Sequence, residues 1–241
     1  MPLYFPSRAA SAAAAGAVVV LMAACTTTHA AAGAAAPAPP TTAVAPASSP
    51  APTAVRPSEP EPPGASRQTE ASVLSIPSVG IAGLRVMPYE GTTDDAPGTR
   101  IQDKGVAASP YGEHGGVGPG QVGNFLVTAH RLSAGGPLRD LPAVAKGDSV
   151  LVTVGDVVYT YEITASRKTS FRSERSLSEQ RAAVPGKPGV APTQAMITIS
   201  TCATPEDHAE GNFWSDAQGN PEHRIDRIGV LRKTTGASSA G

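Results

Sequence analysis

The sequence predicts an all-β domain that forms a closed or nearly closed β-barrel with short helices and long loops. The main observation is a series of roughly seven or eight short segments, rich in β-branched and apolar residues, between about residues 71 and 233. Segments rich in glycine, proline, aspartate and threonine separate them, as is typical of turns and loops. Little of this region has the 3.6-residue periodicity of an amphipathic helix.

The charge of the chain argues against a nucleic-acid-binding protein, and its cysteines point to an exported protein with a free thiol. The 241 residues carry a formal net charge of −1, so they lack the basic footprint of a nucleic-acid-binding protein, and we expect no nucleic-acid partner. The two cysteines are Cys25 and Cys202. We expect them not to pair, because Cys25 ends an export signal. An exported domain that keeps one free thiol needs a reason to keep it, and a nucleophile is such a reason.

Residues 1–25 have the features of an export signal, with an apolar run, Ala9–Ala24, that is short for a spanning helix. The run ends in Leu21–Cys25, which resembles a bacterial lipoprotein box in which the Cys25 thiol carries a diacylglycerol. Met22 stands where that box usually has leucine. A lipoprotein, an uncleaved signal anchor and simple secretion all remain open. The first two would tether the domain to the outer face of the membrane.

Residues 26–70 are dominated by alanine, proline, threonine and serine. Such a segment cannot bury enough apolar surface to offset the entropy lost on ordering, so we predict a disordered linker. About 40 extended residues of this kind reach at most on the order of 120 Å. The linker would therefore act as a spacer that lifts the folded domain, residues 71–233, into a cell wall. Residues 234–241 are expected to form a flexible tail.

The first half of the domain contains three expected strands. Val73–Ile81 has a proline inside it, which indicates an edge strand or a kink, and Leu84–Pro88 is the second strand. Glu90–Gly120 is expected to be a loop. Asn124–His130 is a clear strand with one apolar face, and its mixed face ends in a titratable residue, His130.

The second half of the domain adds a hairpin and two further strands. The expected elements are a helical turn at Leu138–Leu141, a hairpin of Ser149–Val154 and Val157–Ala165, a short helix at Ser176–Ala183, the strand Ala195–Cys202, a long insert at Ala203–Pro221 and a last strand at Ile225–Leu231. With these strands the domain has enough of them to close a barrel.

The strand Ala195–Cys202 carries the main candidate for chemistry. With a period of two, Ile197, Ile199 and Thr201 form a β-branched face that is expected to lie in the core. The opposite, polar face ends in Cys202. A thiol there is placed for chemistry, and the alternative is a free cysteine that packs as a small buried hydrophobe.

A cysteine, a histidine and an arginine together can carry out acyl transfer. The thiolate is the nucleophile, and a protonated histidine both stabilises it and can protonate a leaving amine. Arginine stays charged and can stabilise the oxyanion of an attacked carbonyl. Cys202, His130 and an arginine of the last strand would supply these three roles.

Metal binding is the rival use of cysteine and histidine, and we predict no metal site and no cofactor. A structural zinc site needs about four ligands, and no paired-ligand spacing is present. The acidic cluster Glu206–Glu210 is either a cation site or a solvated loop, and its short sequence favours the loop. His114 and His223 are expected to be surface or loop residues.

Several motifs, in the right order, resemble the sortase family over about residues 71–233. They are Thr198–Cys202 followed by a last strand carrying arginine, Gly118–Asn124 leading into Thr128–Arg131, the opening strand Leu74–Pro77, and Leu138–Leu141 followed by Lys146–Asp148. Each motif is weak alone, and their combination is specific. Among subclasses the chain looks most like class E and class F sortases of high-GC Gram-positive bacteria.

The resemblance implies an eight-stranded sortase barrel and a cysteine transpeptidase. Such an enzyme cleaves an LPXTG-type sorting signal of a surface protein after its threonine and holds the acyl group as a thioester. It then transfers the acyl group to an amine of a cell-wall precursor or a pilin. On this chain Cys202 would be the nucleophile and His130, as imidazolium, the general acid. Thr201 would help to position the substrate.

Two features depart from the family pattern. Ala129 precedes His130 where many sortases have glycine, a change that we expect to be tolerated. The insert after the cysteine strand is long and carries Phe213 and Trp214. These aromatic side chains either shape a substrate groove or pack the loop, and we favour packing.

Two arginines compete for the third catalytic role. Arg227 enters an apolar strand segment, whereas Arg224 follows His223, a pairing also seen in some sortases. Because they are three positions apart, they face opposite sides of an extended strand, and only one can meet the thioester. The sequence leaves both as candidates.

Two other functions remain open. A non-catalytic exported binding lipoprotein on a sortase-like barrel would have a degenerate site, and the intact set of cysteine, histidine and arginine argues against it. A cysteine hydrolase would use the same residues with water as the acceptor.

Overall fold

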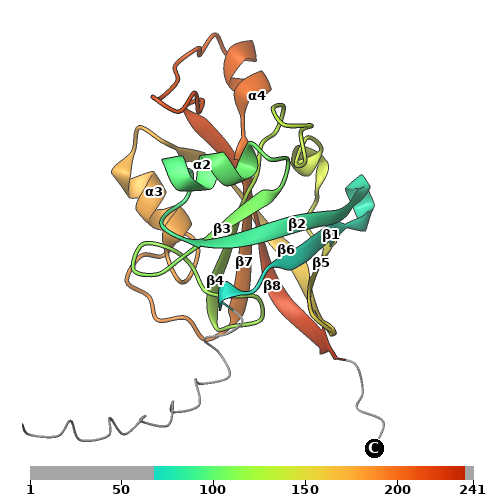
Figure 1. Ribbon diagram of the computed structural model, residues 1–241. Helices are drawn as coiled ribbons and strands as arrows, with labels where there is room; N and C mark the ends of the chain where they lie inside the picture. The colour runs from blue at the N-terminus through green and yellow to red at the C-terminus, as the bar shows by residue number, and fades with distance from the viewer. Residues whose placement is uncertain (1–67, 237–241) are drawn as a thin grey trace, which may run out of the picture. The chain divides into compact units, whose positions relative to one another are not determined.

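The computed structural model describes residues 68–236 (Figure 1). The predicted export signal with Cys25, the linker up to residue 67 and the last five residues lie outside the described residues. No helix in the described part of the chain is long and apolar enough to cross a membrane. The elements are β1 (Ser72–Ile76), η1 (Pro77–Val79), β2 (Ile81–Glu90), α2 (Ala96–Gln102), β3 (Ala107–Tyr111), β4 (Gly123–Thr128), η2 (Leu141–Ala143), β5 (Ser149–Val154), β6 (Val157–Ser170), α3 (Glu174–Arg181), β7 (Ala195–Cys202), α4 (Thr204–Ala209) and β8 (His223–Thr235).

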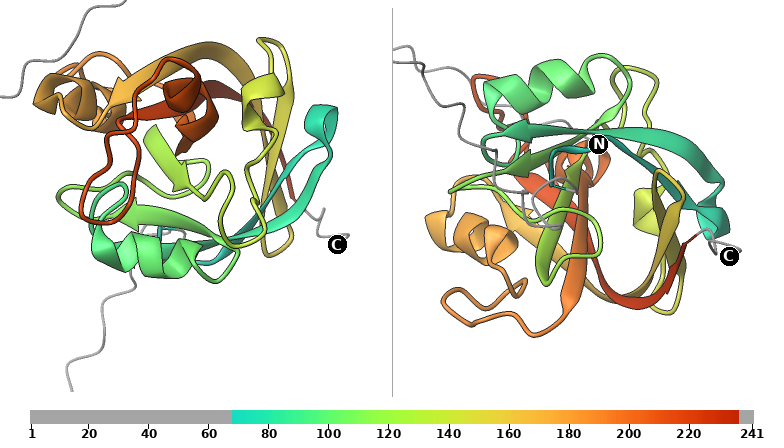
Figure 2. Two further views of the ribbon diagram at one scale, coloured as in Figure 1. Left: turned by 90° about the horizontal axis from the view of Figure 1, so that it is seen from above. Right: turned by 60° about the horizontal axis from the view of Figure 1, so that its bottom comes forward.

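Eight strands close into a barrel in the order β1-β2-β3-β4-β7-β8-β6-β5, and β5 pairs back onto β1 (Figure 2). The pairs β2–β3 and β4–β7 are parallel, and the remaining pairs are antiparallel. Among residues 68–236, this closure leaves no long sheet edge unpaired. Helices α2 and α3 lie outside the barrel wall. The prediction of an all-β, eight-stranded closed barrel is confirmed.

Alternating side chains fill the barrel interior. On β7, Ile197 and Ile199 are fully buried, as the period-two pattern predicts, and Phe125 and Val127 of the neighbouring β4 join the same core. Each such side chain contributes about 1.5–3 kcal/mol relative to exposure to water. The core therefore fixes which face of β4 and β7 points outward, and with it the direction of the polar side chains.

The segment between β1 and β4 differs from its prediction. Val73–Ile81 is not one strand, because Pro77 begins the turn η1, which ends at Gly80 with a left-handed φ of 70°. The expected loop Glu90–Gly120 contains α2 and β3. Helix α2 depends on a local cap, because the Asp95 side chain accepts a hydrogen bond from the Gly98 amide at 2.7 Å.

The second half of the domain follows its prediction closely. The hairpin of β5 and β6 and the helix α3 are present, and the expected helical turn lies slightly later, as η2. Strand β8 begins earlier than expected, at His223, and the insert contains the short helix α4. The early start of β8 matters for function, because it brings Arg224 into the sheet.

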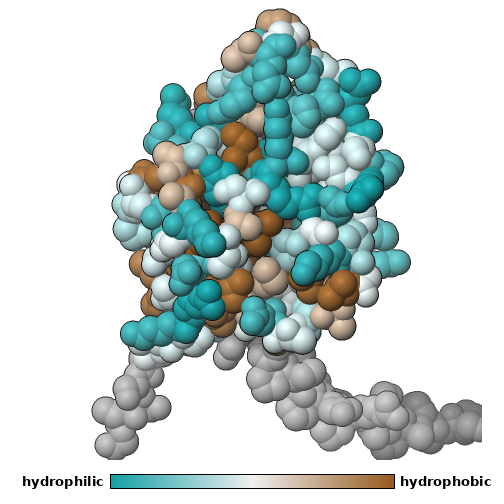
Figure 3. Space-filling view, turned by 180° about the vertical axis from the view of Figure 1, so that it is seen from behind, coloured by the Kyte–Doolittle hydropathy of each residue, from teal (hydrophilic) through white to brown (hydrophobic). Residues whose placement is uncertain are grey.

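The surface of the domain carries scattered apolar side chains. In the view from behind, they form separate patches between hydrophilic residues (Figure 3). The exposed large apolar residues are Val73, Val122, Leu132, Val190 and Phe213. They come from different segments, and single exposed apolar residues are normal on a soluble domain.

Candidate active site

The strand register brings three predicted site residues into one row. Strands β4 and β7 are parallel neighbours with Thr128 opposite Ser200, so His130 and Cys202, two residues further along, follow at the same end. Strand β8 pairs with β7 on its other side and places Arg224 opposite Cys202. The sequence therefore brings a thiol, an imidazole and a guanidinium together at the ends of three adjacent strands.

The polar face of β7 is buried on the outside of the barrel wall rather than open to water. Thr198 and Ser200 are 1% and 2% exposed. Gln180 of α3 covers this face, and its side-chain amide donates to Ser200 Oγ at 3.2 Å and to Asp226 Oδ1 at 3.0 Å. Burial raises the pKa of Asp226, against the hydrogen bonds from its neighbours. This buried, hydrogen-bonded layer lies beside the row of three residues.

Cys202 is half-buried at the end of β7 and forms no disulfide within the described residues. It borders a cavity of about 330 Å³ that is open to solvent. The lining residues are Thr99, Asp103, His130, Arg131, Leu132, Ser133, Cys202, Thr204, Gln218, Gly219 and Asn220. The thiol is therefore accessible, which fits the chemical interpretation and not that of a buried hydrophobe.

His130 contacts a carboxylate and borders the same cavity as the thiol. Its Nε2 lies 2.8 Å from Oδ1 of Asp103, and the His130 side chain is 15% exposed. The hydrogen bond with Cys202 is the largest cause that raises the pKa of His130, and Asp103 raises it further, whereas burial opposes both. This arrangement favours the imidazolium form. Sequence reasoning missed Asp103, because it directly follows α2, in the segment expected to be a loop.

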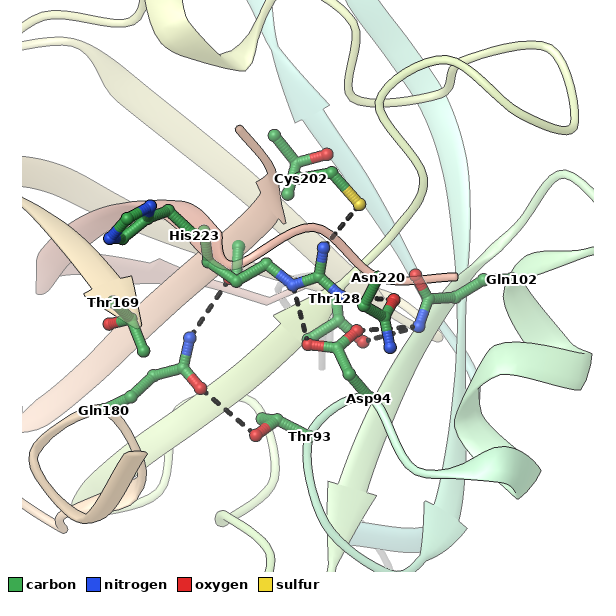
Figure 4. A network of polar contacts seen from close by, with 12 residues as sticks. Thr93, Asp94, Gln102, Thr128, Thr169, Gln180, Cys202, Asn220 and His223 are labelled. Carbon is green, nitrogen blue, oxygen red and sulfur yellow. Dashed lines mark hydrogen bonds and ion pairs between the residues drawn. The ribbon is translucent and has the colours of Figure 1, made fainter. Parts of the chain in front are cut away.

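Arg224 is 2% exposed, and a different partner holds each nitrogen of its guanidinium. Nε donates to Asp94 Oδ2 at 3.1 Å, Nη2 donates to Asn220 Oδ1 at 2.7 Å, and Nη1 donates to the sulfur of Cys202 (Figure 4). The ring of Phe171 lies 4.5 Å from the guanidinium carbon and covers one face. A buried cation thus points one nitrogen at the thiol.

Arg227 lies elsewhere. Its Nε donates to the carbonyl of Val144 at 2.8 Å and its Nη2 to the carbonyl of Pro142 at 2.6 Å. These main-chain acceptors belong to η2 and the residue after it. The structure therefore brings Arg224, and not Arg227, to the thiol, consistent with the expectation that the two face opposite sides of β8.

Two neighbours of the row connect its strands. The Thr201 hydroxyl is 1% exposed and donates to the carbonyl of Ala129 at 2.8 Å, so it ties β7 to the residue before His130. Arg131 forms a two-pronged ion pair with Glu206 of α4 at 2.8 and 3.0 Å, and Nη1 also donates to the carbonyl of Cys202 at 3.3 Å. Sequence reasoning did not identify Arg131.

The insert between β7 and β8 is more structured than expected. Asp207 is 1% exposed, and its carboxylate accepts from the His223 amide at 2.9 Å and lies 2.8 Å from His223 Nδ1. The acidic cluster is therefore only partly a solvated loop, because Thr204–Ala209 form α4 and Asp207 is buried, whereas His208 and Glu210 are exposed. His223 is 22% exposed and lies at the start of β8 rather than in a loop, where its pairing with Asp207 fastens α4 to β8. The described residues contain no cluster of metal-ligating side chains.

The two aromatic residues of the insert differ in burial. Phe213 is 72% exposed and stacks on His208 with ring centroids 4.7 Å apart. Phe213 therefore packs on another residue of the insert, as expected, but it does so at the surface. Trp214 is half-buried, and the guanidinium of Arg172 lies 5.8 Å from its ring centroid.

Comparisons with known proteins identify the family of the folded domain. A family model described as "Sortase domain" matches residues 74–218, more than half of the chain. No curated protein sequence gives a significant match.

Solved structures of similar fold include three sortases from Streptomyces and Actinomyces species. Sortase E from Streptomyces avermitilis is 25% identical with a TM-score of 0.51, and the match covers 72% of this chain and 95% of that one. The SrtA sortase from Actinomyces oris is 20% identical with a TM-score of 0.54 over 71% and 84%. Sortase E1 from Streptomyces coelicolor, solved with a tripeptide in its active site, is 18% identical with a TM-score of 0.53 over 72% and 94%. The last two show likeness of fold.

Proposed function

This chain belongs to the sortase family, and from that membership we propose that it is a cysteine transpeptidase acting through Cys202, His130 and Arg224. The observation that carries the proposal is the row of these three side chains across β4, β7 and β8, with the guanidinium against the sulfur at an open cavity. A thiol nucleophile, a proton donor and an oxyanion stabiliser are the components of acyl transfer.

The first half-reaction would form a thioester. The Cys202 thiolate attacks the carbonyl of the threonine in an LPXTG-type sorting signal, and Arg224 stabilises the oxyanion of the tetrahedral intermediate. His130 as imidazolium donates its proton to the leaving amine of the next residue. Asp103, 2.8 Å from His130 Nε2, supports the protonated ring before the proton is transferred.

The second half-reaction would consume the thioester. Neutral His130 accepts a proton from the incoming amine, which attacks the thioester carbonyl and expels the Cys202 thiolate. We propose that the amine belongs to a cell-wall precursor or a pilin. No metal or redox group is needed to balance either step, and we propose that the enzyme works without a cofactor.

The other predicted site residues take different roles in this proposal. Arg227 closes the barrel wall through main-chain carbonyls and takes no part in chemistry. We propose that Thr201 acts on the substrate only indirectly, by holding the segment that carries His130, because its hydroxyl is engaged with Ala129.

The proposal also covers where the protein is located in the cell and which sortase subclass it belongs to. Sortases generally act outside the cytoplasm at the membrane. We propose that residues 1–25 tether this chain to the outer face of the cell membrane, through a lipid on Cys25 or as a signal anchor. Residues 26–70 would then be the spacer, with the catalytic domain at residues 71–233 and a tail at 234–241. The likeness to sortase E, 25% identical, supports a class E-like or class F-like enzyme.

The test uses reduced, full-length protein with a library of fluorogenic sorting peptides, with and without a glycine amine. Intact mass spectrometry would follow adducts on Cys202. We expect an acyl adduct that yields an amide product only when amine is present, and the reactive peptide would identify the motif. An adduct that turns over equally fast without amine would identify a hydrolase instead. Well-folded protein that forms no adduct with any peptide would contradict the enzyme and favour a binding module.

A further inference from the structure

A buried aspartate outside the expected site lies beneath Arg224. Asp94 belongs to the loop between β2 and α2, 130 residues away from Arg224 in sequence, and its side chain is 2% exposed. Its backbone φ is 59°, in the left-handed region that non-glycine residues seldom adopt, although aspartate tolerates it better than most. Strain of this kind at a buried polar residue indicates that the placement of the side chain matters.

Both oxygens of Asp94 are in use. Oδ2 accepts from Arg224 Nε at 3.1 Å, and Oδ1 accepts from Gln102 Nε2 at 3.2 Å. Gln102 is 3% exposed and also donates to Thr128 Oγ1 at 3.3 Å, at the end of the strand that leads to His130. A carboxylate can accept from both sides, whereas an asparagine at this position has one acceptor oxygen for two donors.

The charge of Asp94 balances the buried guanidinium. Burial by itself lowers the pKa of Arg224, but the negative charge of Asp94, followed by that of Cys202, outweighs burial and raises this pKa. Without Asp94, a buried cation would face the thiol with no carboxylate partner, and such an arrangement is strongly unfavourable.

The orientation of the Arg224 guanidinium follows from the hydrogen bonds that fix two of its nitrogens. Asp94 holds Nε, and Asn220 holds Nη2, while Asn220 is itself held by Asp216 through bonds of 2.8 and 2.9 Å. A planar group fixed at two nitrogens has one orientation, and here it directs Nη1 at the sulfur of Cys202.

We propose that Asp94 is a positioning residue for acyl transfer, which holds Arg224 in the plane where one nitrogen meets the reacting carbonyl. This inference rests on the proposed function, because it requires that Arg224 serves the reaction. Asp94 acts through Arg224 and does not touch the substrate.

The first measurement compares Asp94→Asn with the matched control Asp95→Asn in the full-length protein. Asp95 carries the same charge in the same loop but bonds to the amides of Gly98 and Thr92, at 2.7 and 3.0 Å, and not to Arg224. For Asp94→Asn we expect kcat to fall roughly 10- to 100-fold at nearly constant KM, because a misplaced catalytic group loses rate steeply. For Asp95→Asn we expect less than about a twofold change in kcat, because Asp95 does not contact Arg224. Asparagine keeps the cap bond from Gly98 and loses only the bond from the Thr92 amide, a loss that lowers stability rather than turnover.

The second measurement asks whether Asp94 acts through Arg224. Adding Asp94→Asn to Arg224→Lys should change kcat little beyond the loss caused by Arg224→Lys alone, because lysine already lacks the planar group that Asp94 orients. Independent, multiplicative losses in the double variant would contradict the proposal. So would a folded Asp94→Asn protein with unchanged kcat, whether or not its midpoint of thermal unfolding is lowered.

Failure of the proposed function and failure of the positioning role would give different results. If the wild-type protein forms no acyl adduct on Cys202, the proposed function is wrong, and this inference is wrong with it. If the wild-type protein turns over and Asp94→Asn matches Asp95→Asn, only the positioning role is wrong.

Discussion

Two arginines three residues apart on β8 are both buried, but different kinds of partner hold them. Arg227 donates to two main-chain carbonyls near η2. Arg224 donates to a carboxylate, a side-chain amide and a thiol, and an aromatic ring covers one of its faces. Main-chain acceptors are present whatever the side chains are, whereas the partners of Arg224 depend on the identity of each side chain. Arg227 therefore stabilises the barrel, whereas Arg224 is oriented toward the reactive thiol.

The same contrast recurs in two histidine–aspartate pairs. His130–Asp103 and His223–Asp207 are both 2.8 Å apart, but the Asp103 side chain is 60% exposed and that of Asp207 is 1% exposed. The neighbouring Cys202 raises the pKa of His130, and both residues line the same open cavity. His223 fastens α4 to β8 through a carboxylate that is closed off from solvent. The distance between histidine and aspartate therefore does not distinguish a catalytic pair from a structural one. The distinguishing feature is whether the pair lies near the thiol and is open to solvent.

The largest expected effect is that of Cys202→Ala. Removing the thiol should abolish both adduct and amide product, because no other group in the row can form the thioester. The side chain is small and half-buried, so the midpoint of thermal unfolding should change little. Product formation that survives in this variant, measured with a reactive sorting peptide, would contradict every catalytic interpretation of the site.

His130→Ala should lower kcat by about 10² to 10⁴-fold, the range typical of a general acid or base. The matched control is His114→Ala, because His114 lines a separate cavity near α3 and should not affect turnover. Steady-state kinetics on both variants would check this prediction. Equal kcat values in the two variants would show that His130 is not the general acid or base.

Asp103→Asn should have a smaller, pH-dependent effect. The bond with Cys202 is the largest cause that raises the pKa of His130, and Asp103 adds to it, so loss of the Asp103 charge should lower this pKa. The imidazolium would then be lost at lower pH, and the alkaline limb of the kcat/KM profile should move to lower pH. The exposed turn residue Asp156, changed to asparagine, provides the control, and a profile that shifts equally in both variants would refute the assignment.

Asp207→Ala should affect stability and leave turnover per folded molecule nearly unchanged. The change leaves the His223 amide and ring nitrogen without their carboxylate, and an unsatisfied buried group costs about 1–3 kcal/mol. Chemical denaturation would measure the loss in free energy of unfolding. A loss of kcat with unchanged stability would mean that this second pair belongs to the site.

Much of the barrel could be predicted, because its strands alternate apolar and polar residues and its hairpin carries a recognisable turn. Helix α2 and strand β3 could not. Helix α2 is seven residues long and contains Pro97 and Gly98, so its residues favour a loop, and it forms because Asp95 caps it and the barrel packs against it. Strand β3, Ala107–Tyr111, is short, contains a proline and lacks a clear alternating pattern.

The site was predictable only where a strand ends in a reactive residue. Cys202 and His130 follow apolar strand patterns, so both could be identified from the sequence. The choice between Arg224 and Arg227 depends on which side of β8 faces the thiol, and the pairing of β8 with β7 decides it. Asp94 and Asp103 could not be identified from the sequence, because both lie beside helix α2, which was not predicted. Their partners, Arg224 and His130, are distant in sequence and come close only in the folded domain.

One measurement tests the central claim, that Arg224 serves the reaction and Arg227 serves the fold. The rate of Cys202 acylation by a reactive sorting peptide would be compared in Arg224→Lys and Arg227→Lys, each normalised to its folded fraction. Removal of one oxyanion donor typically slows catalysis by about 10²- to 10³-fold, and we expect a loss of this order for Arg224→Lys. Arg227→Lys should acylate at nearly the wild-type rate and unfold at a lower temperature. The opposite pattern, with slow acylation in Arg227→Lys and a normal rate in Arg224→Lys, would contradict the account.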